Sequence, residues 1–499
     1  MIPMRKEYII TLLALVLAVS CTTRFPAGGE STDEAISVSP DYAEAVIPCN
    51  ISPLNFSIGN PGRHFVTRIT GSNGGEITIP GKNVKIDLRE WKELLEANKG
   101  AELEYGFKVK RNGAWHELKG FTVQVAEDSI DEYLVYRLLA PSYEFYTAFS
   151  IRERNLSTGK DREVYNNRMH YNPKEQQCMN CHQFQNGRTE NWQMHVRQVL
   201  GGTLIITGDE SRKVSLKTDS TISAGVYPAW HPSERLIAYS VNRTRQFFHE
   251  KNIHKLEVQD PASDLIMYDI DRNEVSKVAD DPMAFETFPT WSPDGKMLYY
   301  SSARQPEIAT LPSDSIAICF DKIYYDIVRR SFDPATKAFG EEELVYDAKS
   351  LEKSAMEARI SPDGRYLLFS LGEYGTFHIW HRGSDLWVKD LETGEAWPLE
   401  EANSKDADSF HNWSSNGRWI VFTSRRDDGL FTRTYFTYFD KEGKAHKPFM
   451  LPPRDFSGKK DRVYSYNVPE FTVEPVRQSV RDLSKMISQP AIQAQYAGR

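Results

Sequence analysis

A 14-residue segment recurs four times between residues 227 and 423 and constrains the fold more than any other feature. Its copies are YPAWHPSERLIAYS, FPTWSPDGKMLYYS, EARISPDGRYLLFS and FHNWSSNGRWIVFT. Each copy is a turn rich in Pro, Asp and Gly, followed by a nearly continuous apolar run that suits a strand covered on both faces. Successive copies, marked by Pro232, Pro293, Pro362 and Ser415, are 61, 69 and 53 residues apart. A propeller blade takes about 40–45 residues, so each unit predicts one blade plus a sizeable loop.

These repeats resemble the β-propeller repeats of the TolB family, periplasmic proteins whose blades carry Trp-Ser-Pro-Asp-Gly before an aromatic-rich strand. The resemblance covers residues 203–475 and recurs four times in register. The outer copies depart from it, with His231 in place of Ser in the first and Ser415-Asn416 in place of Pro-Asp in the last. The likeness implies a propeller with six blades, by analogy with TolB, and five blades are the alternative. A weaker echo around Pro469 and the apolar strands just before the first copy can close the ring, which would leave no unpaired sheet edge.

The N-terminus has the features of an export signal. Two basic residues precede an apolar run over residues 8–19, which is too short to span a bilayer, since that takes roughly 20 residues. The stretch LAVSC resembles a bacterial lipobox, in which the cysteine becomes the lipidated first residue of the mature chain; Ala18 stands where that motif prefers leucine. The resemblance implies a signal peptide over residues 1–20 and lipid on Cys21. The alternative is a plain signal peptide with an incidental cysteine.

The rest of the chain divides into segments by its pattern of apolar and polar residues, and the whole is predicted to be mainly β. Short alternating runs punctuated by Gly, Asn and Pro predict strands and turns, while LREWKELLEANKG has the apolar spacing of a helix that ends at a glycine. The predicted segments are a flexible tether over 21–45, a small β-rich domain over 46–150, a linking segment over 151–202, the propeller over 203–475, and a surface helix or loose tail over 476–499.

The linking segment carries the strongest chemical motif, Cys178-Met179-Asn180-Cys181-His182. Cys-x-x-Cys-His is the signature of covalent c-type haem attachment: two thiols add to the vinyl groups and the adjacent histidine reaches the iron. The export signal supplies the compartment in which attachment takes place. A zinc site would need a second ligand pair with metal spacing, and a thioredoxin-like site a βαβ setting, and the sequence offers neither. We therefore expect one haem c held by Cys178 and Cys181 with His182 on the iron; a disulfide or redox pair remains the alternative.

The iron of the expected haem has a second axial position, and candidate ligands for it lie close to this motif. Met194 and His195 lie downstream, and Met169 and His170 lie upstream. We favour the downstream pair, because the intervening stretch can loop back over a haem, and within it His195 over Met194. Either pair can equally be packing residues. The choice matters, because Met/His ligation gives a higher potential than two histidines.

The remaining cysteines and the overall charge set limits on other functions. Beyond Cys21 there are only four cysteines, too few for a disulfide scaffold, and Cys49 and Cys319 are more simply buried thiols than a pair. The formal net charge is −8 and no basic block stands out, so we expect no nucleic-acid partner.

The order of segments resembles a group of haem-carrying propeller lipoproteins from Bacteroidetes, on the phrases YPAWHP, FETFPTWSPDG, WSSNGRW and TSRRDDG. That likeness implies an outer-membrane lipoprotein, facing the periplasm because no acidic run follows Cys21, and it implies no reaction. Three functions stay open. They are an electron-transfer protein with a redox partner, an interaction module in which the haem is structural or sensory, and a haem peroxidase or reductase. With one haem and no acid–base cluster beside it in sequence, we expect electron transfer with a protein partner.

Overall fold

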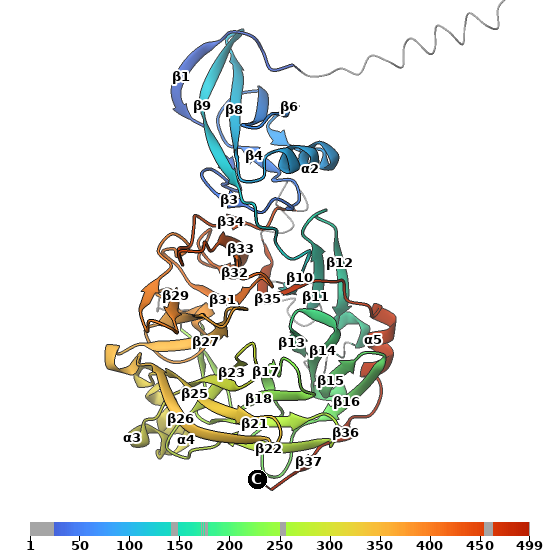
Figure 1. Cartoon of the computed structure of the whole chain (residues 1–499), viewed down its shortest axis with the longest axis vertical. Helices are drawn as coiled ribbons and strands as arrows, with labels where there is room; N and C mark the ends of the chain where they lie inside the picture. The colour runs from blue at the N-terminus through green and yellow to red at the C-terminus, as the bar shows by residue number, and fades with distance from the viewer. Residues whose placement is uncertain are drawn as a thin grey trace, which may run out of the picture.

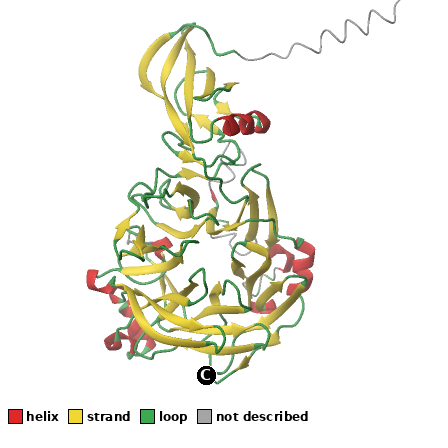
Figure 2. Cartoon of the chain, viewed as in Figure 1, coloured by secondary structure: helices red, strands yellow, loops and turns green. Residues whose placement is uncertain are grey.

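The computed structural model describes residues 24–140, 148–170, 172, 174, 178–249, 256–453 and 463–498. In these residues a small β domain lies at the rim of a ring of β-sheets (Figure 1). Strands make up the ring, and most helical segments lie at its periphery (Figure 2). No helix in the described ranges is long and apolar enough to cross a membrane. Cys21 and the signal sequence lie outside the described residues.

The N-terminal domain consists of two sheets and one helix, as its alternating sequence predicts. The larger sheet contains β1 (Glu30–Ala35), β9 (Ala114–Val125), β8 (Glu102–Arg111), β5 (His64–Gly71) and β6 (Glu76–Pro80), with β3 (Val46–Ile47) beside β9. The smaller sheet contains β2 (Val38–Ser39), β4 (Phe56–Ile58) and β7 (Asn83–Val84). Helix α2 (Leu88–Ala97) begins where the Asp87 side chain accepts hydrogen bonds from the Arg89 and Glu90 amides, and it buries Trp91, Leu94 and Leu95.

The ring is a β-propeller, and the described residues form six blades. From its inner to its outer strand, blade 1 is β35 (Ser465–Thr472), β10 (Tyr133–Leu139), β11 (Ser150–Asn155) and β12 (Asp161–Asn166). In the same order, blade 2 is β13 (Cys178–Gln185), β14 (Arg188–Arg197), β15 (Gly202–Thr207) and β16 (Glu210–Ser215). Blade 3 is β17 (Val226–Trp230), β18 (Leu236–Asn242), β21 (Ser263–Asp269) and β22 (Glu274–Ala279); blade 4 is β23 (Glu286–Trp291), β24 (Met297–Ser302), β25 (Asp326–Asp333) and β26 (Ala338–Tyr346). Blade 5 is β27 (Ser354–Ile360), β28 (Tyr366–Gly372), β29 (Asp385–Asp390) and β30 (Ala396–Pro398); blade 6 is β31 (Asp408–Trp413), β32 (Trp419–Ser424), β33 (Arg433–Tyr438) and β34 (Phe449–Met450).

The ring closes through strands from opposite ends of the propeller sequence. The inner strands neighbour one another all the way round, including β31 with β35 and β35 with β13. In blade 1 the late strand β35 pairs antiparallel with the early strand β10, with Tyr133 opposite Thr472 and Leu139 opposite Ser465. The expected mainly-β fold and the preferred six blades are confirmed, and the echo around Pro469 is the strand that closes the ring.

The sheets do not follow the segment boundaries expected from sequence. Blade 1 already begins at Tyr133, inside the segment expected to be the N-terminal domain. The expected linking segment 151–202 supplies β11 to β14, half of the strands of blades 1 and 2, because its polar, irregular sequence conceals strands that pair with distant partners. In the C-terminal segment 476–499, α5 (Val480–Ile487) packs on blades 1 and 2. Two short strands, β36 (Ile492–Gln493) and β37 (Gln495–Tyr496), then extend the outer edges of blades 2 and 3.

Two insertions leave the ring beyond the second strands of their blades. One follows β18 and contains the hairpin of β19 (Arg245–Phe248) and β20 (Leu256–Gln259). The other follows β24 and contains the short helices α3 (Pro306–Ala309) and α4 (Ser313–Ile318). An ion pair of 2.7 Å between Arg245 and Asp314 joins the two insertions. They account for part of the excess of the repeat spacing over one blade.

The inner strands carry carboxyl groups that the propeller buries. Burial raises the pKa of Glu286 on β23 and of Glu470 on β35 to about 8 each, and that of Glu357 on β27 to about 7. The Asp264, Glu342 and Asp281 carboxylates raise the pKa of Glu286 further. An acid whose pKa is raised in the folded state keeps a proton that the unfolded chain has lost, so its contribution to stability falls as the pH rises between the two values.

We expect the free energy of unfolding to fall as the pH rises from about 5 to about 8, and the substitution Glu286→Gln to flatten this dependence. Well below the ordinary pKa of 4.5 the variant and the wild type should be equally stable, because the carboxyl is then protonated in both the folded and the unfolded chain and its amide replacement is neutral as well. Above pH 8 the variant should be the more stable, with an upper limit of roughly 1.4 kcal/mol for each unit by which the pKa is raised. Urea unfolding across this pH range measures the effect. The control Glu93→Gln, at an exposed position of α2, should leave the profile unchanged, and an equal pH slope in Glu286→Gln would refute the assignment.

Candidate functional site

The Cys178–His182 motif lies in β13, the inner strand of blade 2. Every inner strand contains a β-bulge with one non-glycine residue at positive φ, which is uncommon elsewhere. These residues are Cys181, Tyr227, Phe288, Glu357, Phe410 and Val468, with φ values of 55°, 47°, 52°, 60°, 46° and 47°. The second cysteine of the motif therefore occupies the bulge position of the propeller repeat. The four aligned repeats do not include blade 2, although its CHQF matches FHNW of blade 6 and VPEF of blade 1.

The repeat gives His182 a structural counterpart elsewhere in the ring. It directly follows the bulge residue of blade 2, and His411 directly follows that of blade 6. Both imidazoles are buried against backbone groups of the ring, those of Val468 and Val135 for His182 and those of Glu357 and Leu368 for His411. Phe410 stands in blade 6 where Cys181 stands in blade 2. A histidine at this position therefore occurs in the ring with and without cysteines, and His411 serves as an internal control for His182.

Two guanidinium groups flank the two thiols. Arg137 Nη2, from the neighbouring strand β10, lies 3.4 Å from Cys178 Sγ, and the Arg137 guanidinium stacks 4.4 Å from the centre of the Phe149 ring. The positive charge of Arg197, at the exposed end of β14, also acts on both cysteines. Within the described residues neither arginine forms an ion pair with a carboxylate. The sequence alone could not identify these residues, since their closeness depends on blade pairing.

The two cysteines differ in exposure. Cys178 is partly exposed and Cys181 is buried, and both are free thiols. Burial raises the pKa of the Cys181 thiol, and Arg197, the Tyr227 backbone and Arg137 offset this only in part. The Gln193 side chain donates a hydrogen bond to the Cys181 carbonyl, which anchors the bulge to β14.

The His182 ring is enclosed between blades 1 and 2. It is 2% exposed, close to the Val468 and Val135 backbones, and its centroid is 6.3 Å from that of Phe184. Burial and the charge of Arg137 lower its pKa to about 4. The imidazole is therefore neutral at pH 7, which is the form that binds metals.

The downstream candidates for a second axial ligand lie on opposite faces of the blade 2 sheet. Met194 is fully buried in the apolar cluster between blades 1 and 2, together with Phe184. His195 follows it in the strand and therefore faces the other way, with Nδ1 3.1 Å from Thr203 Oγ1; burial and Arg197 lower its pKa to about 3. Met194 thus shares the side of His182, and His195 does not.

The upstream candidates, Met169 and His170, have other surroundings. Met169 is exposed, and His170 Nε2 contacts the backbone oxygen and hydroxyl of Ser484 on α5. Residues 141–147, 171, 173 and 175–177, which precede β11 and β13, lie outside the described ranges.

The donor set of the site fits a c-type haem. It offers two unoxidised thiols, a neutral imidazole, and two cations without carboxylate partners among the described residues. Because His182 is enclosed, coordination of an iron there requires the Val468 or Val135 backbone to move. Within the described ranges no group of three or more His, Cys, Asp and Glu side chains is placed to hold a metal ion on its own.

Cys49 and Cys319 do not form a disulfide. Cys49 lies in the N-terminal domain, with Sγ 3.5 Å from the Glu127 carbonyl oxygen, and Cys319 follows α4 in the propeller. Both are free thiols, so the simpler expectation of single thiols is confirmed.

Comparison with known proteins does not assign the chain to a family. No protein-family model matches the chain, and no curated protein does. Among solved structures it is similar to Kuenenia stuttgartiensis hydrazine synthase (10% identity, TM-score 0.43), covering 70% of this chain and 48% of that one. It is also similar to an oligogalacturonate lyase from Vibrio parahaemolyticus, with 12% identity and a TM-score of 0.32, covering 83% of this chain and 100% of that one. The β-propeller domain of the Trilobed protease from Pyrococcus furiosus is similar with 11% identity and a TM-score of 0.32, covering 72% of this chain and 96% of that one. The chain spans about half of the hydrazine synthase chain. The assignment of six blades rests on the order of strands in this chain's own sheets.

In protein made without haem-attachment machinery, we expect iodoacetamide to alkylate Cys178 roughly tenfold faster than Cys181, because Cys178 is more exposed and the pKa of Cys181 is raised. Peptide mass spectrometry over time measures both rates. Arg137→Gln should slow the reaction of Cys178 and leave that of Cys319 unchanged. Equal rates at Cys178 and Cys181 would contradict the described environments.

Proposed function

We propose that this chain is an exported, lipid-anchored monohaem c-type cytochrome on a propeller scaffold, and that it transfers electrons to or from a protein partner. The observation that carries the proposal is the motif itself in its folded setting: two free thiols beside a buried, neutral histidine. The lipobox resemblance at Cys21 and the likeness to Bacteroidetes lipoproteins with TolB-like propellers support an outer-membrane anchor facing the periplasm.

Each residue of the site has a role in this proposal. Cys178 and Cys181 would hold the haem through thioether bonds, and His182 would ligate the iron, with Met194 or His195 as candidates for the second axial position. Arg137 and Arg197 can pair with the carboxylates of the group, since neither has a carboxylate partner in the described part of the chain. A bound haem supplies reversible one-electron exchange.

A partner surface lies on the same face of the ring as the start of β13. In each blade the start of the inner strand pairs with the end of the second strand, as Cys178 does with Arg197 and Val226 with Ser240. The hairpin after β18 therefore leaves the ring on the face where Cys178 lies. Phe248 on that hairpin and Ile318 on α4 are each 78% exposed, and the ion pair of Arg245 with Asp314 joins the two insertions. Exposed apolar groups of this size on long insertions support protein docking.

A redox-active thiol pair is the second candidate function. The observation in its favour is the contact of the Arg137 guanidinium with Cys178 Sγ, because reactive cysteines are commonly partly exposed and lie beside a positively charged side chain. In that role Cys178 would attack and Cys181 would resolve the mixed disulfide, with no haem present.

The covalent attachment can be tested with a matched pair of histidine variants. Purified from a host with haem-attachment machinery, the wild type should show a c-type absorption spectrum that survives denaturation, and Cys178→Ser or Cys181→Ser should weaken or abolish covalent retention. His182→Asn should change the axial ligation and the spectrum. His411→Asn, the same change at the equivalent position of blade 6, should leave the spectrum intact even if it lowers the melting temperature. A wild type without haem but with a Cys178–Cys181 disulfide would favour the thiol pair instead.

The carrier role predicts fast exchange with a protein acceptor and slow reaction with small molecules. In stopped-flow mixing, the reduced protein should be oxidised rapidly by a cytochrome acceptor and turn over hydrogen peroxide and nitrite slowly. Phe248→Ser and Ile318→Ser, at exposed positions, should slow the first reaction several-fold without altering the haem spectrum. Rapid multiple turnover of peroxide or nitrite would identify an enzyme and contradict the carrier role.

A further inference from the structure

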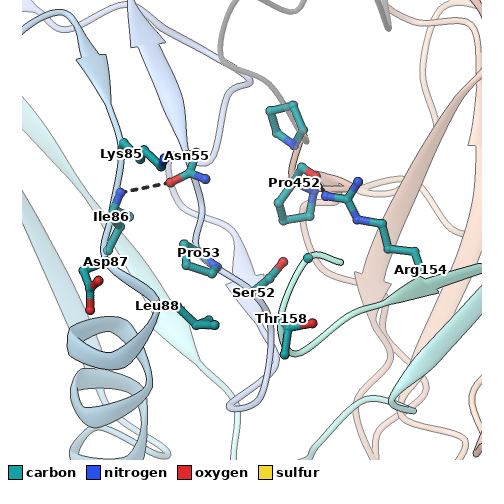
Figure 3. A pocket seen from close by; sticks show the side chains of 12 residues that line it. Ser52, Pro53, Asn55, Lys85, Ile86, Asp87, Leu88, Arg154, Thr158 and Pro452 are labelled. Carbon is teal, nitrogen blue, oxygen red and sulfur yellow. Dashed lines mark hydrogen bonds between the residues drawn. The ribbon is translucent and has the colours of Figure 1, made fainter. Parts of the chain in front are cut away.

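A cavity of about 500 Å³ separates the N-terminal domain from the propeller. Figure 3 shows its two walls: Pro53, Asn55, Lys85 and Leu88 belong to the N-terminal domain, while Arg154 and Pro452 belong to the propeller. Cavities of about 300–1,000 Å³ between domains are a common place for small-molecule sites. This cavity lies outside the Cys178–His182 site and shares no residue with it.

Arg154, at the end of β11, is the unusual residue of this cavity. It is only 3% exposed, and its Nη2 donates to the carbonyl oxygen of Pro452. Its Nε has no hydrogen-bond partner, and within the described ranges no carboxylate forms an ion pair with it. Two residues earlier in the same strand, Arg152 pairs with Asp161 and Glu163. A buried cation is costly unless it is paired, and among the described residues no carboxylate balances the charge of Arg154 at the cavity wall.

The other polar groups of the cavity also favour a negative ligand. Lys85 adds a second cation. One carboxylate, Asp87, also lines the cavity, and its Oδ1 accepts the amides of Arg89 and Glu90 at 2.9 and 3.2 Å. The lining thus holds two cations and one carboxylate, an excess of one positive charge. Asn55 uses its side-chain oxygen to accept the Ile86 amide at 3.0 Å, the dashed line in Figure 3, and its side-chain nitrogen remains a donor.

The walls also include an apolar part. Pro53 and Leu88 come from one domain, and Pro452 and Pro453 come from the other. A ligand that fills the cavity therefore needs a compact apolar body in addition to its charge, and inorganic anions alone satisfy only the cationic part.

We propose that this cavity is a binding site for a small organic anion, a carboxylate or a phosphate monoester with an apolar body, whose oxygen atoms pair with the Arg154 guanidinium. A guanidinium presents paired donors that match the oxygens of a carboxylate or phosphate. Because the walls come from both domains, the bound anion joins the N-terminal domain to the propeller. The inference does not depend on the haem.

Calorimetric titration of the full chain with benzoate, phenyl phosphate and the neutral analogue benzyl alcohol tests the site. At least one of the two anions should bind the wild type and raise its melting temperature, and benzyl alcohol should do neither. Arg154→Gln should weaken that binding by roughly tenfold or more, the usual effect of losing a charged hydrogen bond. Preference for benzoate or for phenyl phosphate distinguishes a carboxylate site from a phosphate site.

Three further variants guard against a folding artefact. Leu88→Trp, which reduces the cavity without touching Arg154, should also weaken binding. Arg154→Lys, which keeps the charge and loses the paired geometry, should bind with intermediate affinity. Arg89→Gln, exposed on α2 and outside the cavity lining, should bind as the wild type does. The proposal is overturned if neither anion binds the wild type, if benzyl alcohol binds equally well, or if Arg154→Gln and Leu88→Trp both bind undiminished.

Discussion

The pairing of β35 with β10 is the interaction on which the rest of the structure depends. It joins strands more than 300 residues apart, Tyr133 with Thr472 and Leu139 with Ser465, and completes the blade that closes the ring between β31 and β13. The same pair forms one wall of the candidate site. Arg137 and Val135 come from β10 and Val468 comes from β35, and all three lie around Cys178 or His182. Closure of the fold and assembly of the site are therefore one event.

The residues that depart from the repeat sequence form additional hydrogen bonds in the folded ring. Ser415 and Asn416 of blade 6 bind the segment that leads from the N-terminal domain: the Ser415 amide donates to Asp131, and the Asn416 side chain donates to the Ser129 carbonyl. In blade 3 the imidazole of His231 takes the place of a serine, and its Nδ1 accepts the amides of Ser233 and Glu234. In both turns the substituted side chains still form hydrogen bonds within the turn or with a neighbouring segment. The outer copies therefore diverge in sequence while the turns themselves remain.

The inner-strand bulges explain how one position can carry both architecture and chemistry. In blades 3 and 4 the residue after the bulge is Pro228 or Pro289, a rigid backbone element. In blade 2 it is His182, with a cysteine at the bulge itself. Because the ring holds this backbone in the same conformation six times, a substitution there introduces a reactive side chain without a new fold. His411 shows that the histidine alone is tolerated as a packed residue.

Sequence alone predicted the propeller, its six blades by analogy, the β-rich N-terminal domain with its helix, and the donor types of the Cys178–His182 motif, because each depends on local turn chemistry, on strand periodicity or on spacing within a few residues. The folded chain was needed to establish that residues 151–202 belong to blades, that Met194 and His195 face opposite sides, and that Arg137 flanks Cys178. A bulge in a strand changes which side chains share a face of the sheet, and it leaves no mark in the amino-acid composition from which it could be predicted. Arg154 and the cavity beside it depend on two domains meeting. Contacts between residues so distant in sequence have no local signature, so only the closed ring and its docked domain reveal them.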